Sequence, residues 1–226
     1  MLACAAVLAA PALGAGVLPS AMSSYLLGPK MIRAEILVIK GNTGVQRDFR
    51  LDRGRLVKRY AAGSLSLLER DGTKTTVKVT SNARVVLNGR TVNVRRLRAG
   101  MQIAVSHEGA LPAVSVYANT GKTAPKWPAA TGVLLLGNKL VRGEIVLQDT
   151  AAHDYRLDHG RIKQIGLTTL VIHEADGTDV SVEVSTTAHV KLNGKNAGYF
   201  ELRKGMMATT MRDGDKPADQ VYATGK

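Results

Sequence analysis

The fold is decided by a stretch of sequence that occurs twice. Residues 48–55 read DFRLDRGR, and residues 154–161 read DYRLDHGR. Further matches follow in the same order: LLGPK at 26–30 with LLGNK at 135–139, DGT at 71–73 with 176–178, NG at 88–89 with 193–194, LRAGM at 97–101 with LRKGM at 202–206, and VYA at 116–118 with 221–223. Such self-similarity is the signature of a repeated structural unit. The 226 residues therefore contain two copies of a unit of roughly 100 residues, the commonest domain size.

Each unit is predicted to be all-β, because its apolar residues recur with a period of two. Val77 and Val79 alternate with polar neighbours, and the valines of residues 180–184 do the same. The dipeptides at 71–72 and 88–89 accept positive φ at both positions, so each predicts a tight two-residue hairpin. The LRAGM stretch predicts one helical turn that re-enters a strand through a glycine. We expect about six short strands per unit, closed or partly open as a small β-barrel that hides its edges.

The repeat also divides the chain. We expect a signal peptide or anchor at residues 1–22, a first β-barrel repeat at 26–119, and a second at 133–226. Residues 120–132 hold Pro125, Trp127 and Pro128 among small polar residues, which is typical of a short, stiff linker.

Composition limits the kinds of site that the chain can build. Apolar residues make up 45% of the sequence and aromatic residues 4%, so the cores must be mostly aliphatic. A single cysteine excludes a disulfide framework and every cysteine-rich metal site, since both need at least two thiols. The formal charge of +13 indicates a polyanionic partner or surface without saying which.

The first 29 residues carry no charged side chain, and residues 2–18 are nearly all Ala, Leu, Val and Gly. This pattern predicts export, with small residues such as Ala10 and Ala12 as cleavage sites. The mature protein is then extracytoplasmic, either secreted or at the cell surface. A retained membrane anchor is the main alternative, although prolines make the run a poor helix. Lipidation at Cys4 is a further alternative.

The order of these features resembles the small tandem-repeat domains of unknown function found in exported bacterial proteins, which look like OB-type barrels. The residues that carry the resemblance are the GRL at 54–56 and GRI at 160–162, the DGT hairpins, the NG turns and the Leu-x-x-Gly-Met elements. The resemblance covers residues 30–226 as two copies. It implies the fold and export, and it implies no activity.

Three sets of residues are weak candidates for chemistry, and each has a simpler interpretation. Gly121-Lys122-Thr123 lacks the earlier glycine of a phosphate loop, and the second unit also ends in Gly-Lys. His153, His159 and His189 could in principle bind a metal, but the aligned residues of the first unit are arginines. Asp48, Asp52, Asp154 and Asp158 lie beside arginines, which favours turn capping and ion pairing over a catalytic carboxylate pair. We therefore predict no catalytic residue, no metal site and no cofactor.

The charge is divided unequally between the units. Residues 26–122 contain eighteen Lys or Arg against six acids, whereas residues 123–226 contain thirteen against twelve, giving +12 and +1. A polyanion-binding patch is predicted at two groups of cations on the first unit: Arg47, Arg50, Arg53, Arg55, Lys58 and Arg59, with Arg95, Arg96 and Arg98. The simpler interpretation is a solvated basic face that aids solubility.

These observations predict an exported, non-enzymatic binding or structural protein of the bacterial envelope. Its basic first repeat would contact an anionic envelope polymer or lipid surface. The alternative is an OB-type module that binds nucleic acid, which exposed aromatic residues near the patch would favour. An undetected enzyme is the third class. A sign change at matched positions, Lys74 and Lys78 against Asp179 and Glu183, predicts that the units face each other or that molecules associate head to tail.

Overall fold

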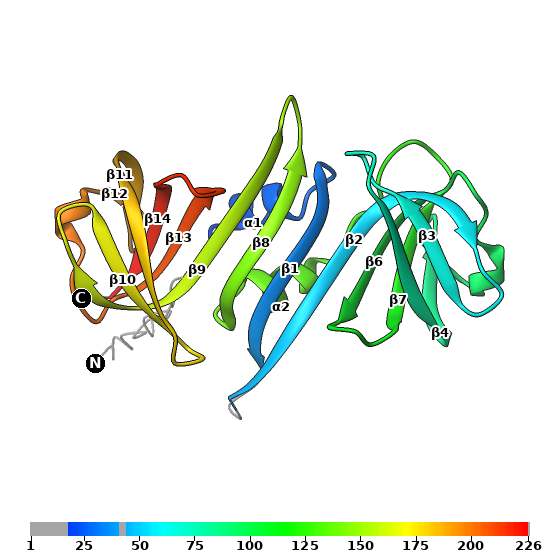
Figure 1. The fold of residues 1–226 in the computed structure, drawn as a ribbon, viewed down its shortest axis with the longest axis horizontal. Helices are drawn as coiled ribbons and strands as arrows, with labels where there is room; N and C mark the ends of the chain where they lie inside the picture. Colours follow the sequence, from blue (N-terminus) through cyan, green and yellow to red (C-terminus); the bar gives the residue numbers. More distant parts are fainter. Residues whose placement is uncertain (1–17, 41–43, 226) are drawn as a thin grey trace, which may run out of the picture.

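The computed structural model describes residues 18–40 and 44–225, and it shows the repeat as two similar β-rich units (Figure 1). The elements of the first unit are α1 (Ser20–Leu26), β1 (Met31–Lys40), β2 (Val45–Arg59), β3 (Ser64–Leu68), β4 (Lys74–Leu87), β5 (Arg90–Val92), the 3-10 turn η1 (Val94–Arg96), β6 (Gln102–Glu108) and β7 (Ala113–Asn119). The second unit repeats this order as α2 (Ala129–Leu136), β8 (Leu140–Gln148), β9 (Ala152–Ile165), β10 (Thr169–Glu174), β11 (Asp179–Leu192), β12 (Lys195–Ala197), η2 (Tyr199–Glu201), β13 (Met207–Asp213) and β14 (Ala218–Thr224).

Five strands of each unit close into a barrel. In the first unit the order around the barrel is β2-β3-β4-β7-β6 and back to β2, and in the second it is β9-β10-β11-β14-β13 and back to β9. All neighbours are antiparallel except β4–β7 and β11–β14, which are parallel. Alternate side chains such as Leu56, Leu65 and Leu67 fill the first barrel and are fully buried. Burying an aliphatic side chain of this size stabilises the fold by roughly 1.5–3 kcal/mol.

The prediction of a mostly β fold with small barrels is confirmed, while the helices α1 and α2 were not predicted and the strand count differs. Each unit has seven strands rather than about six, because a three-residue strand pairs only with β4 or β11 and the first strand lies outside the barrel. The predicted tight turn at Asn88 and Gly89 is confirmed by φ values of 49° and 80°. At Asp71-Gly72 only the glycine has positive φ, 90°, and Glu69 N–H donates to the Thr73 carbonyl, so this loop is longer than the predicted two residues.

The glycine in the DFRLDRGR and DYRLDHGR stretches is required by a close approach between strands. A Cβ on Gly160 would lie 2.3 Å from the carbonyl oxygen of His173, and one on Gly54 would lie 2.6 Å from that of Leu68. Any larger residue at either position would push the neighbouring strand away, since both close contacts are with backbone.

The two barrels are joined by the first strand of each unit. β1 and β8 pair antiparallel, so the two barrels share one continuous sheet (Figure 1). Glu35 is paired with Glu144, its equivalent in the repeat, while Leu37 is paired with Arg142 and Arg33 with Val146. This register places a local twofold axis between the two glutamates.

A third core lies between this central sheet and the two helices. It contains Leu26 of α1, Ile36 of β1, Leu135 of α2 and Ile145 of β8, all of which are buried. Trp127 packs against the same core, so residues 120–132 are held against the molecule rather than acting only as a spacer. Because its members come from both units, separating the units would expose part of this core to water.

The predicted docking of the two units through oppositely charged strands is wrong. Lys74 and Lys78 lie on β4, and Asp179 and Glu183 lie on β11, which belong to barrels at opposite ends of the molecule (Figure 1). The units meet through β1 and β8 because that pairing satisfies the backbone of both strands. Head-to-tail association between molecules stays a prediction.

The predicted signal peptide or anchor lies mostly outside the described residues, which begin at Leu18. Leu18 itself is buried in the central core, 3% exposed. In residues 18–40 and 44–225, no helix combines the length and the apolar character that a membrane crossing requires.

Candidate anion-binding surface

The outer surface of the strands β2, β3 and β4 carries four cations, which we call the basic face: Arg55, Lys58, Lys74 and Lys78. Residues paired across adjacent strands lie on the same side of a sheet. The relevant pairs are Arg55 with Leu68, Leu68 with Lys74, Lys58 with Ser66, and Ser64 with Lys78. The four cations therefore lie on one surface, with serine hydroxyls of β3 between them.

These four side chains are exposed, and none has an ion pair among the described residues. Lys58 makes a cation–π contact, in which its Nζ lies 5.0 Å from the centre of the Tyr60 ring. Like charges on neighbouring strands repel one another. An anionic ligand would relieve this repulsion, so the surface is suited to bind one.

Two other members of the first predicted group are neutralised within the protein. The Arg47 guanidinium donates from Nε and Nη2 to both carboxylate oxygens of Glu108. Arg50 Nη2 lies 3.3 Å from Glu35 Oε1, and Arg50 Nε lies 3.6 Å from Asp48 Oδ2. These two arginines are less available to a ligand than the basic face.

Arg53 is a structural residue, only 5% exposed. It donates to the carbonyl of Gly28 and, over 3.1 Å, to the carbonyl of Pro125, and its guanidinium lies 5.5 Å from the centre of the Trp127 ring. Burial lowers the pKa of Arg53 to about 10. Arg53 thus fixes the segment between the units and does not reach the surface.

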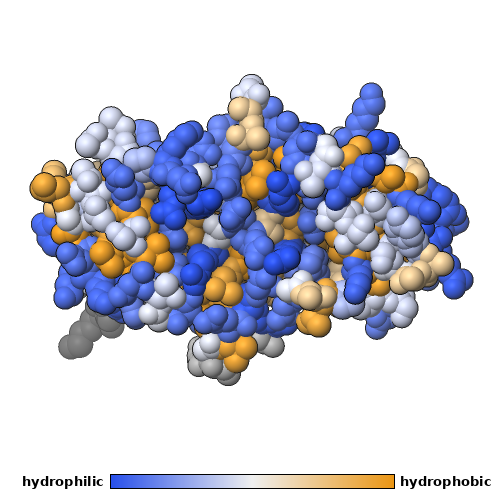
Figure 2. All heavy atoms as spheres, viewed as in Figure 1, coloured by the Kyte–Doolittle hydropathy of each residue, from blue (hydrophilic) through white to orange (hydrophobic). Residues whose placement is uncertain are grey.

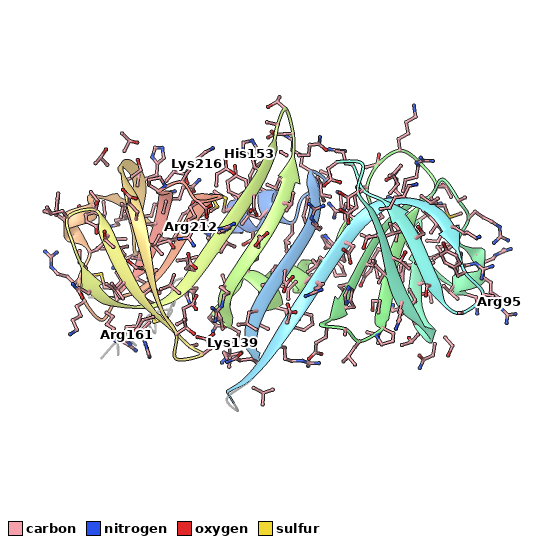
Figure 3. All side chains as sticks on the ribbon, in the orientation of Figure 1. Arg95, Lys139, His153, Arg161, Arg212 and Lys216 are labelled. Carbon is pink, nitrogen blue, oxygen red and sulfur yellow. The ribbon has the colours of Figure 1, made fainter. Side chains whose placement is uncertain are left out.

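The second predicted group surrounds the 3-10 turn at the end of the first barrel (Figure 3). Arg90, Arg96 and Arg98 line an open groove of about 540 Å³. Arg98 donates to the carbonyls of Arg95 and Leu97, and Arg203 makes the equivalent bonds in the second unit, so this arginine caps the turn. Arg90, Arg95 and Arg96 are exposed and have no ion pair in the described parts of the chain.

The two groups of cations are neighbours through the backbone. Leu56 donates its N–H to the Met101 carbonyl, and its own carbonyl accepts from Gly100 N–H, both over 2.8 Å. The turn that carries Arg98 therefore lies directly beside the strand that carries Arg55. Arg59, at the end of β2, is also exposed. The structure thus brings Arg55, Lys58 and Arg59 of the first group close to the second group at the 3-10 turn.

The corresponding surface of the second unit is neutralised by its own side chains. Lys163 Nζ and His173 Nδ1 both contact the carboxylate of Asp179, the latter over 2.7 Å. These hydrogen bonds lower the pKa of Asp179. Glu183 and Glu201 stand where the first unit has Lys78 and Arg96. The free cationic surface is therefore specific to the first unit.

The sequence alone did not place Lys74 and Lys78 in the candidate patch. Alternation along a single strand shows which residues share a side, but it does not show which strands are neighbours. The signal that could have found the two lysines is the sign change between the repeats at these positions.

The three histidines considered as metal ligands lie in different surroundings. His153 Nδ1 lies 3.2 Å from Asp213 Oδ2, whereas the buried His159 Nδ1 lies 2.8 Å from Thr209 Oγ1. His189 is exposed on β11. Within the described ranges, no three or more His, Cys, Asp or Glu residues are arranged to hold a metal ion.

No protein-family model matches this sequence, and no curated protein matches it either. The case for function therefore rests on the geometry of the surface itself.

Proposed function

We propose that this protein is a non-enzymatic, exported binding protein whose first unit holds an anionic polymer of the bacterial envelope on the basic face. The observation that carries the proposal is the contrast between the repeats. The first unit keeps Arg55, Lys58, Lys74 and Lys78 without acidic partners among the described residues. At the matching positions the second unit has the acidic Asp179, which pairs with Lys163 and His173, and Glu183.

A polymer fits the surface better than a small anion. The cations are spread over three strands that lie about 4.8 Å apart, so a chain with repeated negative charges can contact several of them at once. The groove around Arg90 and Arg96 extends the same charge toward the end of the barrel. Binding would then rest on release of counterions, which gives an affinity that falls steeply with salt.

The strand order supports comparison with OB-type barrels. In such barrels the face of the second and third barrel strands, here β3 and β4, is the part that binds ligands. This comparison also supports the alternative, a nucleic-acid module. Readers of single strands usually add several stacking aromatic rings, whereas Tyr60 is the exposed ring beside the basic face. A polymer without bases is therefore preferred.

Export is supported by the uncharged N-terminal sequence, and the position of Leu18 limits where a signal peptide could be cleaved. Because Leu18 is buried in the central core, a cleavage that preserves this fold falls before that residue. The N-terminal sequence of the mature protein, together with its recovery outside the cytoplasm, would test this part of the proposal.

The binding proposal is tested with the full chain and three probes: inorganic polyphosphate, an oligothymidylate and vesicles of anionic lipid. We expect polyphosphate to bind most tightly. Changing the four cations of the basic face to Glu should abolish binding at physiological ionic strength. A control variant changes four exposed lysines elsewhere to Glu, with the same change in net charge: Lys122, Lys126, Lys195 and Lys204.

The control variant should keep most of the affinity, because its lysines lie outside the basic face. Equal losses in both variants would show that binding follows net charge alone, and the proposal would then be wrong. Tighter binding of oligothymidylate than of polyphosphate would favour the nucleic-acid alternative.

A further inference from the structure

A second groove lies over the central sheet, where the two units meet. It has a volume of about 410 Å³, within the usual range of ligand sites. Its polar lining comes from both units: Glu35, Asp48, Arg142, Glu144, Arg156, Asp158 and Arg212. Ile36 and Ile145, which alternate with the two glutamates, face the helices, so the groove opens on the opposite side of the sheet. We call it the central groove.

The view in Figure 2 shows a largely hydrophilic surface over the central strands. In Figure 3, Arg212 of β13 lies beside β9, one of these strands. The side of the central sheet away from α1 and α2 therefore carries charged side chains, although the sheet lies between two apolar barrel cores.

Several buried polar atoms at the central groove have no hydrogen-bond partner in the described structure. The side chain of Asp158 is only 9% exposed, and its Oδ2 has no hydrogen bond of good geometry. Arg212 Nη2 lies 3.5 Å away, and the neighbouring Thr210 hydroxyl, which interacts with Asp158, is also buried without a well-formed bond. The Nη atoms of Arg142 and Arg156 pair with Asp176 and Asp215, but their Nε atoms are buried without a hydrogen bond of good geometry, that of Arg156 lying 3.6 Å from Asp154 Oδ2. Buried polar groups in native proteins are nearly always paired, so each such atom calls for a missing partner.

The equivalent positions of the first unit do not share this feature. Asp52, Arg33 and Arg50 correspond to Asp158, Arg142 and Arg156, and none of them has a buried atom without a partner in residues 18–40 and 44–225. Asp52 lies 3.4 Å from His107, whose place in the second unit is taken by Arg212. The unpaired atoms are therefore not a general consequence of the fold.

The groove offers both signs of charge and both hydrogen-bonding roles. The charges of three guanidinium groups and four carboxylates nearly cancel. A strongly charged ligand of either sign would therefore meet charges of its own sign. The free Nε–H groups need acceptors, and the free oxygen of Asp158 needs a donor. A hydroxyl group supplies both, and several hydroxyls on one ring would satisfy several of these atoms together.

We propose that the central groove is a binding site for a neutral saccharide. Asp158 accepts hydrogen bonds from ring hydroxyls, and the Nε–H groups of Arg142 and Arg156 donate to hydroxyl oxygens. The open groove would admit a segment of a longer chain. This site is distinct from the basic face and does not depend on the function proposed for it.

The test uses calorimetry and NMR titration of the full chain with three neutral trisaccharides: maltotriose, cellotriose and N,N′,N″-triacetylchitotriose. We expect at least one to bind and to shift amide resonances of β8 and β9. Asp158→Asn should weaken that binding about tenfold or more, because a hydrogen bond to a charged group is lost. The matched change in the first unit, Asp52→Asn, should leave the affinity unchanged.

Arg156→Gln provides a second variant at a more exposed position, so that the result does not depend on the folding of the Asp158 variant. It should also weaken binding, while thermal melting remains close to that of the wild type. Failure of all three trisaccharides to bind at millimolar concentration would overturn the proposal. Equal binding by the wild type and by both groove variants would place the saccharide elsewhere and would also overturn it.

Discussion

The buried His159 should make this protein sensitive to acid by a predictable amount. The side chain is 2% exposed, and burial lowers the pKa of His159 from 6.5 to about 4. The unfolded chain therefore binds a proton at higher pH than the native protein does, and acidification from pH 6.5 to pH 4 favours unfolding. At pH 4.5 this linkage lowers the free energy of unfolding by about 2.5 kcal/mol relative to neutral pH.

The perturbation that isolates this effect is His159→Gln. Glutamine keeps a hydrogen-bonding group beside Thr209 Oγ1 and does not titrate. Urea unfolding, followed by circular dichroism, gives the free energy of unfolding of the wild type and the variant at pH 7.5 and pH 4.5. The change in the free energy of unfolding between the two pH values is compared between the proteins. This difference cancels the contributions of all other titrating groups, which the two proteins share, and the effect of the substitution at neutral pH.

We expect the variant to lose about 2.5 kcal/mol less than the wild type between the two pH values. An NMR titration of the His159 ring in the native protein should show no protonation above pH 5. If the two proteins lose the same free energy within about 0.5 kcal/mol, then burial does not suppress the charge of His159, and the reasoning is refuted.

Three further outcomes follow from the same contacts. Gly160→Ala should destabilise the protein by about 3 kcal/mol in urea unfolding, because the new Cβ would meet the backbone of β10. The control Gly166→Ala, where the nearest contact of the new Cβ is at 3.5 Å, should change stability by less than about 1 kcal/mol. Similar losses in both variants would refute the close approach at Gly160. Burial raises the pKa of Glu174 from 4.5 to about 7, so the stability that depends on its protonation is fully present below pH 4.5 and is lost as the pH rises through 7. Glu174→Gln should remove this pH dependence of the free energy of unfolding. An unchanged pH profile in the variant would contradict the raised pKa. Four cations on the basic face predict that log K for oligothymidylate falls with log salt at a slope of about −3, measured by fluorescence anisotropy, and a slope near zero would exclude the face as the site.

Arg53 and Arg55, which are two residues apart, show how much of the candidate surface the sequence could predict. Both belong to the predicted patch, yet Arg53 is buried against Trp127 while Arg55 is exposed on the basic face. Alternation puts both residues on the same side of one strand, and it does not show that residues 120–128 fold back over one of them. Only contact with a distant segment separates the two roles.

The sequence by itself determined the local structure and the charge of each unit. The repeat defined two copies, the period of two defined strands, and Asn88-Gly89 defined a turn, because each depends on residues close together in the chain. The tertiary structure decided that β1 pairs with β8 of the other unit on one edge, as well as with β2 of its own unit on the other, and that the basic face and the central groove form where they do. Strand alternation is satisfied by many pairings, so the choice among them depends on closing two barrels and burying one shared core at the same time.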